Sequence, residues 1–254
     1  MVKAGKAYDI IVPSKGRADP SLAPTMHQLE KAKVEYTIVV EKEDLNHYSA
    51  SFPNASFWVL PASNRGIGYS RNYILQRASR PFVMVDDDVY STFRRVTTMK
   101  KITLLKFLDD GWKIFTKLLS QHPTLAVFGF KHGTFAIPKV ATTLNTTIAH
   151  CVFVNAPLLH RANVHYDEKL RAFEDIDIIF KCIQNGLMVA RNNHLVYLTT
   201  PSGMSVVGGI DYHNDLKHKQ LSKMIKRYPG WIESDHRIRE KDGQPVYHIN
   251  WGRI

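Results

Sequence analysis

Three consecutive aspartates, Asp86 to Asp88, follow the apolar run PFVMV, which has the composition of a short buried strand. On an extended backbone alternate side chains point to the same side, so Asp86 and Asp88 can face one ligand while Asp87 points away. Neighbouring carboxylates repel one another unless a cation neutralises them, and Mg²⁺ and Mn²⁺ bind such oxygens while keeping positions for phosphates. The spacing therefore favours a divalent-metal site, although a polar turn after a strand could have the same residues.

A second acidic group, Glu174, Asp175 and Asp177, stands at the start of an apolar helical pattern. Carboxylates in a first helical turn are favoured by the helix dipole whatever their function. Beside a metal-bound phosphate, such a carboxylate could instead act as the general base that takes a proton from an attacking hydroxyl. Both interpretations stay open from the sequence.

A glycine turn at Gly66 and Gly68 opens a helix that carries Arg71 and Asn72. A helix N-terminus with a nearby arginine suits a phosphate or a carboxylate. The same residues are equally consistent with a tight turn whose arginine braces the aspartate loop.

Among the 12 histidines, His213 is our candidate for a further metal ligand. It follows two glycines in VVGGIDYHND, and glycines allow the backbone to approach a ligand closely. His194 and His218 are the alternative candidates.

The elements that must position these residues alternate between short strands and helices. We expect helices at about 22–32, 66–79, 102–122 and 173–186, and strands at about 8–13, 35–44, 57–61, 82–85, 125–130 and 149–155. Residues 187–200 begin and end as strand. This order predicts an α/β fold with a mostly parallel twisted sheet and helices on both faces. Ligands of such sheets bind outside the carboxyl ends of the strands, where the loops at 14–17 and 86–88 would lie.

Length and composition place the chain among soluble globular proteins. Its 254 residues are 44% hydrophobic, which suits one catalytic core at 1–200 with a basic C-terminal extension at 201–254 packed on the same domain. Only two cysteines, Cys151 and Cys182, are present, so the sequence supports neither a disulfide framework nor a cysteine zinc site. No apolar run is long enough for a membrane span, and we expect a cytoplasmic monomer.

The charge balance makes nucleic acid a candidate partner. The chain has 34 Lys and Arg against 23 Asp and Glu, a formal net charge of +11, and such an excess attracts polyanions by counterion release. A solvated basic face with aromatic residues packed beneath it is the alternative interpretation of the C-terminal extension. The candidate nucleic-acid contacts are Arg94, Arg95, Lys223, Lys226, Arg227, Arg237 and Arg239.

The motifs, taken in order, resemble the family-2-type glycosyltransferases with a GT-A fold. The matching pieces, spread over about 8–200, are IIVPSKGR, an acidic residue after the second strand, GIGYSRN, VMVDDDV and FEDID. More narrowly, VPSKGR, NRGIGYSRNYI and VDDDV resemble the TET-associated glycosyltransferases, a phage and eukaryotic group linked to sugar addition on oxidised pyrimidines in DNA.

This resemblance implies a role for several of the matching residues. Asp88 would bind Mn²⁺ or Mg²⁺ on the donor diphosphate, and Glu174 or Asp175 would lie at the acceptor, with Asp175 the better candidate for the base. The family often shows Asp-x-Asp, so three aspartates leave the register open by one residue. The residues that would border the nucleotide are Pro13, Ser14, Arg17, Glu41, Gly66, Arg71 and Asp86.

The implied reaction moves a sugar, with glucose as the expected one, from a UDP-sugar to a hydroxymethylated pyrimidine such as hydroxymethylcytosine in DNA. This would be a bacteriophage-type DNA modification in the host cytoplasm. One alternative is a GT-A glycosyltransferase that acts on a polysaccharide, a protein or a small molecule. An alternative of another class is a non-catalytic nucleic-acid-binding module, against which the two separate acidic groups argue.

Overall fold

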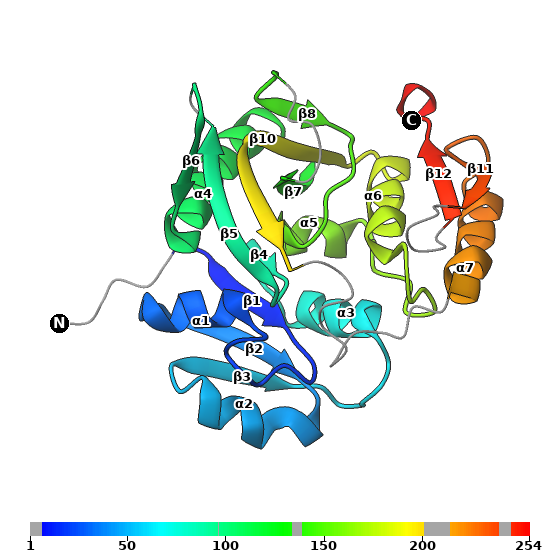
Figure 1. The fold of residues 1–254 in the computed structure, drawn as a ribbon. Helices are drawn as coiled ribbons and strands as arrows, with labels where there is room; N and C mark the ends of the chain where they lie inside the picture. Colours follow the sequence, from blue (N-terminus) through cyan, green and yellow to red (C-terminus); the bar gives the residue numbers. More distant parts are fainter. Residues whose placement is uncertain (1–6, 96, 134–138, 201–213, 239–244) are drawn as a thin grey trace.

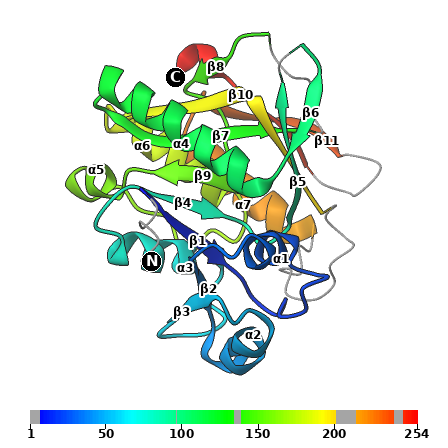
Figure 2. The same ribbon diagram turned by 90° about the vertical axis from the view of Figure 1, so that its left-hand side faces the viewer.

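The computed structural model describes residues 7–95, 97–133, 139–200, 214–238 and 245–254. A large twisted sheet forms the centre of the molecule, and helices cover both of its faces (Figures 1 and 2). Its strand order is β3-β2-β1-β4-β9-β7-β10-β5-β6, and β8 pairs with β10. The strands are β1 (Asp9–Pro13), β2 (Tyr36–Val40), β3 (Ala55–Val59), β4 (Phe82–Val85), β5 (Val89–Arg95), β6 (Met99–Ile102), β7 (Leu125–His132), β8 (Thr142–Leu144), β9 (Cys151–Val154) and β10 (Met188–Thr199).

Most strands of this sheet run in one direction. β3, β2, β1 and β4 are parallel neighbours, and β7, β10 and β6 share their direction, whereas β9, β5 and β8 run the opposite way. The predicted α/β class and mostly parallel sheet are therefore confirmed. The helices are α1 (Pro24–Lys31), α2 (Leu45–Ser51), α3 (Ile67–Arg77), α4 (Leu104–Gln121), α5 (Ala156–Arg161), α6 (Glu174–Gln184) and α7 (Asn214–Arg227).

The alternation of apolar side chains along the strands divides the core into two layers. In β4, Val83 and Val85 pack with α1, α2 and α4 on one face, while Phe82 and Met84 pack with α3, α5 and α6 on the other. This burial on both faces explains why β1, β2 and β4 are almost continuously apolar. None of the helices in the described ranges is long and apolar enough to cross a bilayer.

Several elements differ from those expected from the sequence. The strand expected at 35–44 ends at Val40, and a 3-10 turn (Lys42–Asp44) leads into α2. The hairpin of β5 and β6 was not predicted, because β6, with the sequence MKKI, is largely exposed and has no apolar alternation. The expected break within 187–200 is absent: β10 is one strand with a shift of register on β7 between Asn192 and Val196.

The C-terminal segment packs beside α6. It consists of α7, a two-stranded hairpin of β11 (Ile232–Ile238) and β12 (Pro245–Ile249), and a 3-10 turn (Trp251–Arg253), and it lies at the side of the molecule next to α6 (Figure 1). Tyr228, Trp231 and Trp251 pack around Phe180 of α6. Tyr228 is buried and the two tryptophans are partly buried, in agreement with the interpretation of a basic face with aromatic residues beneath it.

Candidate active site

The candidate site lies at the carboxyl ends of the parallel strands. Ser14 follows β1, Glu41 follows β2 and Asp86 follows β4. Because β9 runs antiparallel to β4, the residue before β9, His150, lies at the same edge, and its carbonyl accepts a hydrogen bond of 2.6 Å from the Asp86 amide. Parallel and antiparallel neighbours thus bring residues from distant parts of the sequence to one place.

Asp86 is the most strongly paired of the three aspartates. Its carboxylate accepts from Arg71 Nη2 at 3.2 Å and lies 2.9 Å from His150 Nδ1. Burial raises the pKa of Asp86, but Arg71 and His150 outweigh that effect and hold it at about 2. Asp86 is therefore ionised near neutral pH.

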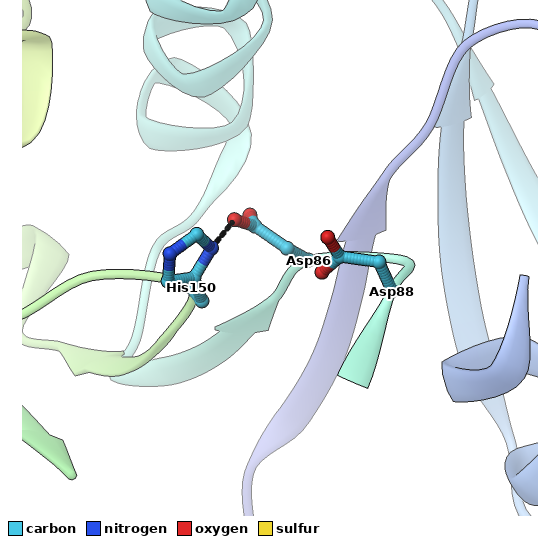
Figure 3. A group of neighbouring side chains, drawn as sticks. All are labelled: Asp86, Asp88 and His150. Atoms are coloured by element: carbon cyan, nitrogen blue, oxygen red, sulfur yellow. Dashed lines mark hydrogen bonds and ion pairs between the residues drawn. The ribbon is translucent and has the colours of Figure 1, made fainter. Parts of the chain in front are cut away.

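Asp88 faces the same region (Figure 3) and is only partly compensated by the charges of His150 and Arg17. Its Oδ1 atom is buried and has no hydrogen-bond partner among the described residues. Burial, together with the charge of Asp86, raises the pKa of Asp88 to about 7. A buried carboxylate oxygen without a partner is costly, and a cation would satisfy it.

His150 completes a set of metal donors that the sequence did not predict. One donor atom each of Asp86, Asp88 and His150 lies within 4.8 Å of the other two (Figure 3). The carboxylate Asp86 raises the pKa of His150 to about 9, although burial acts in the opposite direction. Two carboxylates suit Mg²⁺ or Mn²⁺, and the imidazole favours Mn²⁺ of the two. The only sequence signal for His150 is its position directly before an apolar strand.

Asp87 lies in the turn between β4 and β5, where the extended backbone expected from the sequence is absent, and its carboxylate bonds to the loop that follows β1. It accepts from Ser14 Oγ and Arg17 Nη1, each at 2.5 Å. The main-chain carbonyls of Asp86 and Asp87 accept from Thr25. Ser14 and Arg17, predicted at the nucleotide, therefore hold the aspartate loop through Asp87.

Arg71 braces two acidic groups, which is one of the two interpretations left open by its motif. The residue is 6% exposed, and its guanidinium bonds Glu174 at 2.9 Å as well as Asp86. Asn72, beside it, donates to and accepts from the main chain of Tyr166 at 3.0 and 2.8 Å. The glycine-led helix α3 thus ties the β4 loop to the segment before α6.

Asp175 lies at the start of α6 and faces the metal donors across a small cavity of about 20 Å³, which has room for a single water. The cavity is also lined by Arg71, Asp86 and His150. Burial raises the pKa of Asp175 and of its neighbour Glu174. Asp177 is fully buried on another side of the helix and pairs with Lys181 and Arg227, which is a structural role.

A polar loop cluster borders the ends of β1 and β2. Lys15 Nζ donates to Glu41 at 3.1 Å and to the side-chain oxygen of Asn64. The main-chain amide of Asn64 in turn donates to Glu41 at 2.7 Å. Gly66, with φ of +89°, lies against the guanidinium of Arg171, which donates to the carbonyl of Asn64. Of the residues predicted to border the nucleotide, Pro13, Ser14, Glu41 and Gly66 thus lie around this edge of the sheet.

The predicted nucleic-acid contacts have different surroundings. Arg94 pairs with Asp110, Arg237 pairs with Asp235, and Arg227 bridges Asp167 and Asp177. Arg95 lies at the end of β5, and Lys223 and Lys226 are exposed on α7. Arg239 and His213 lie outside the described residues. The alternative histidine candidates, His194 and His218, are not part of the metal-donor group found in the described ranges.

The fold has solved relatives of low sequence identity. The chain of S. aureus TarS 1–349 aligns with a TM-score of 0.52 and 14% identity over 86% of this chain and 65% of that one. The complex of the same protein with UDP-GlcNAc aligns with a TM-score of 0.51 and 14% identity over 86% of this chain and 66% of that one. The structure of GalNAc-T7 with UDP, GalNAc and Mn²⁺ aligns with a TM-score of 0.50 and 11% identity over 76% of this chain and 44% of that one. This chain thus spans about two thirds or less of these structures, and the likeness shows a shared fold.

The family is shown by the sequence itself. No curated protein matches the chain. The sequence pattern of one family, the TET-associated glycosyltransferases, matches residues 8–209, which contain every acidic residue of the site. The resemblance stated from the motifs is therefore confirmed, and the chain belongs to the TET-associated glycosyltransferase family.

Proposed function

We propose that this protein transfers a sugar, with glucose as the expected one, from a UDP-sugar to a hydroxymethylated pyrimidine in DNA. The observation that carries the proposal is the buried, unpartnered Oδ1 of Asp88 beside Asp86 and His150, at the carboxyl edge of the sheet and opposite the acidic start of α6. Both parts suit sugar transfer from a nucleotide donor, because a cation stabilises the charge on the diphosphate and a carboxylate can take the proton of the acceptor hydroxyl.

Asp86, Asp88 and His150 would hold the divalent ion, for which Mn²⁺ or Mg²⁺ is expected. When bound, the ion supplies Lewis-acid stabilisation of the negative charge on the departing diphosphate. His213, the ligand proposed from the sequence, remains a candidate for a further position on the ion. The complexes of TarS with UDP-GlcNAc and of GalNAc-T7 with UDP and Mn²⁺ support a UDP-sugar donor in this fold.

Asp175 is the proposed general base. Its carboxylate would take the proton from the acceptor hydroxymethyl group as the oxygen of that group attacks C1 of the sugar. Glu174 is less suited to this step because its Oε1 accepts from Arg71 at 2.9 Å. The raised pKa of Asp175 suits a group that must accept a proton near neutral pH.

DNA is the proposed acceptor because of the charge of the chain. The net charge of +11 favours a polyanion over a neutral acceptor. Lys223 and Lys226 offer exposed cations on α7, whereas Arg227 is held by two aspartates and contributes less to such a surface.

The test combines Mn²⁺, a panel of UDP-sugars and DNA that carries 5-hydroxymethylcytosine or 5-hydroxymethyluracil, with UDP release and DNA mass as readouts. We expect a hexose mass on modified DNA and none on unmodified DNA. Asp175→Asn should retain donor binding and lose transfer. UDP-sugar turnover with no sugar on any modified DNA would reject the acceptor, and unaltered transfer by Asp175→Asn would reject the base.

A further inference from the structure

One face of α7 is directed at the start of α6. Gln220, Met224 and Arg227 stand at positions i, i+4 and i+7, which share a helix face. Gln220 is 2% exposed and Met224 is fully buried. Both lie beyond residues 8–209, the range that matches the family, so this contact is an addition of this chain's C-terminal segment to the matched core.

Gln220 binds the main chain directly before the acidic residues of α6. Its Oε1 accepts from the amide of Arg171 at 2.8 Å and from the amide of Ala172 at 2.7 Å. The next residue, Phe173, has φ of 68° and ψ of 11°, a left-handed conformation that is uncommon for a non-glycine residue. Such a conformation is kept only where neighbouring contacts hold it in place. The two hydrogen bonds of Gln220 are among those contacts.

A second contact of α7 holds the same helical turn from its other end. Arg227 Nη1 and the hydroxyl of Tyr228 both donate to Asp177 Oδ1, at 2.6 and 2.7 Å. The backbone of Asp175 therefore lies between two anchors, one at 171–172 and one at Asp177. Neither anchor touches the cavity that Asp175 shares with Asp86 and His150.

We propose that Gln220 is a positioning residue, which acts by fixing the left-handed turn at Phe173 and thus the place of Asp175 relative to the metal donors. The inference rests on the proposed function, because it assigns Gln220 an effect on proton transfer at Asp175. Since a displacement of about 1 Å can cost about a hundredfold in rate, a loosened turn lowers turnover without removing any group that binds the donor.

The test compares Gln220→Leu, which keeps the volume and removes the acceptor atom, with Gln220→Glu, which keeps an acceptor. We expect Gln220→Leu to lower kcat for transfer about tenfold or more, with the KM for the UDP-sugar nearly unchanged, and Gln220→Glu to recover most of the loss. Amide hydrogen exchange at Arg171 and Ala172 should be faster in Gln220→Leu than in the wild type.

Two control variants separate positioning from stability. Met224→Ala removes apolar packing from the same face of α7, so it should lower the Tm and, below that temperature, keep kcat. Ser222→Ala changes an exposed residue whose hydroxyl bonds only its own helix, at His218, and should behave as the wild type. A wild-type kcat in Gln220→Leu, or an equal loss of kcat in Met224→Ala, would overturn the inference.

The proposed function fails in a different way. If the wild type releases no UDP with any donor and acceptor, the glycosyl-transfer activity is rejected, and with it the kinetic part of the inference. The amide exchange of Arg171 and Ala172 does not depend on activity, and unchanged exchange in Gln220→Leu would overturn the anchoring by itself.

Discussion

At the scale of single residues, three identical side chains in a row have three different environments. Asp86 is paired with Arg71 and His150 and has a pKa of about 2. Asp87 is bonded by Ser14 and Arg17, while burial raises its pKa. Asp88 has an unpartnered oxygen and a pKa of about 7. Neighbouring charges and burial, which a sequence motif does not encode, thus assign the roles within the motif.

Binding of Mn²⁺ should release protons near neutral pH. His150, with a pKa of about 9, is then protonated, and Asp88, with a pKa of about 7, is partly so. Both must lose their protons to bind a cation, so calorimetry in two buffers of different ionisation enthalpy should show release of about one proton or more per ion. Metal affinity should therefore rise with pH through this range.

Two variants locate that effect. Asp88→Asn should abolish Mn²⁺ binding and turnover with the fold retained, because it removes a ligand and no core volume. Asp87 bonds Ser14 and Arg17 and is not part of the metal-donor group of the described residues, so Asp87→Asn should still bind Mn²⁺. Proton-free binding in the wild type, or full activity in Asp88→Asn, would reject the metal assignment.

Arg71→Met should destabilise the protein strongly. Removal of the guanidinium leaves Glu174 buried without a cation and Asp86 with His150 alone, and breaking a buried pair in this way costs about 3–5 kcal/mol of the free energy of unfolding. Arg65→Met is the matched control: its side chain is 56% exposed and lies 3.5 Å from Glu168, so the loss should stay below about 1 kcal/mol. Urea unfolding measures the loss of stability in both variants. Equal losses would show that Arg71 does not brace the two acidic groups.

Among the helices and strands, the sequence predicts those that have a clear local pattern of apolar residues. The apolar runs at β1, β2 and β4 and the periodicity of α4 and α6 identify these elements and both acidic groups. His150 could not be found in this way, because its place beside Asp86 depends on β9 returning antiparallel to β4, a pairing between residues far apart in the sequence. The bracing role of Arg71 depends likewise on where α6 packs.

The turn that opens α3 should be sensitive to a single methyl group. Gly66 and Gly186 both have positive φ, +89° and +70°, so alanine strains the backbone at either site by about 1 kcal/mol or more. A Cβ at Gly66 would also displace Arg171, whereas one at Gly186 has nothing within 4 Å. We expect both variants to lower the Tm and only Gly66→Ala to weaken binding of UDP, measured by titration. If Gly66→Ala and Gly186→Ala changed the affinity for UDP equally, Gly66 would not be part of the donor site.

At the scale of the whole molecule, the matched core and the C-terminal segment meet at α6. The core contains the candidate metal ligands after β4 and before β9, and the segment holds the acidic start of α6 through Gln220 and Arg227. The sequence predicted the basic character of this segment and left open whether its aromatic residues pack beneath a basic face. The pairing of Arg227 with Asp167 and Asp177 could not be predicted, because it depends on neighbours that are far apart in the sequence.

We propose that the carboxyl edge of the sheet binds a divalent ion together with the diphosphate of the donor. A crystal of the protein grown with Mn²⁺ and UDP tests it directly through the anomalous signal of manganese. We expect a manganese peak bound by Asp88 and by Asp86 or His150, with the UDP diphosphate on the same ion. Manganese bound elsewhere, or UDP bound away from this edge, would show that the donor does not bind here.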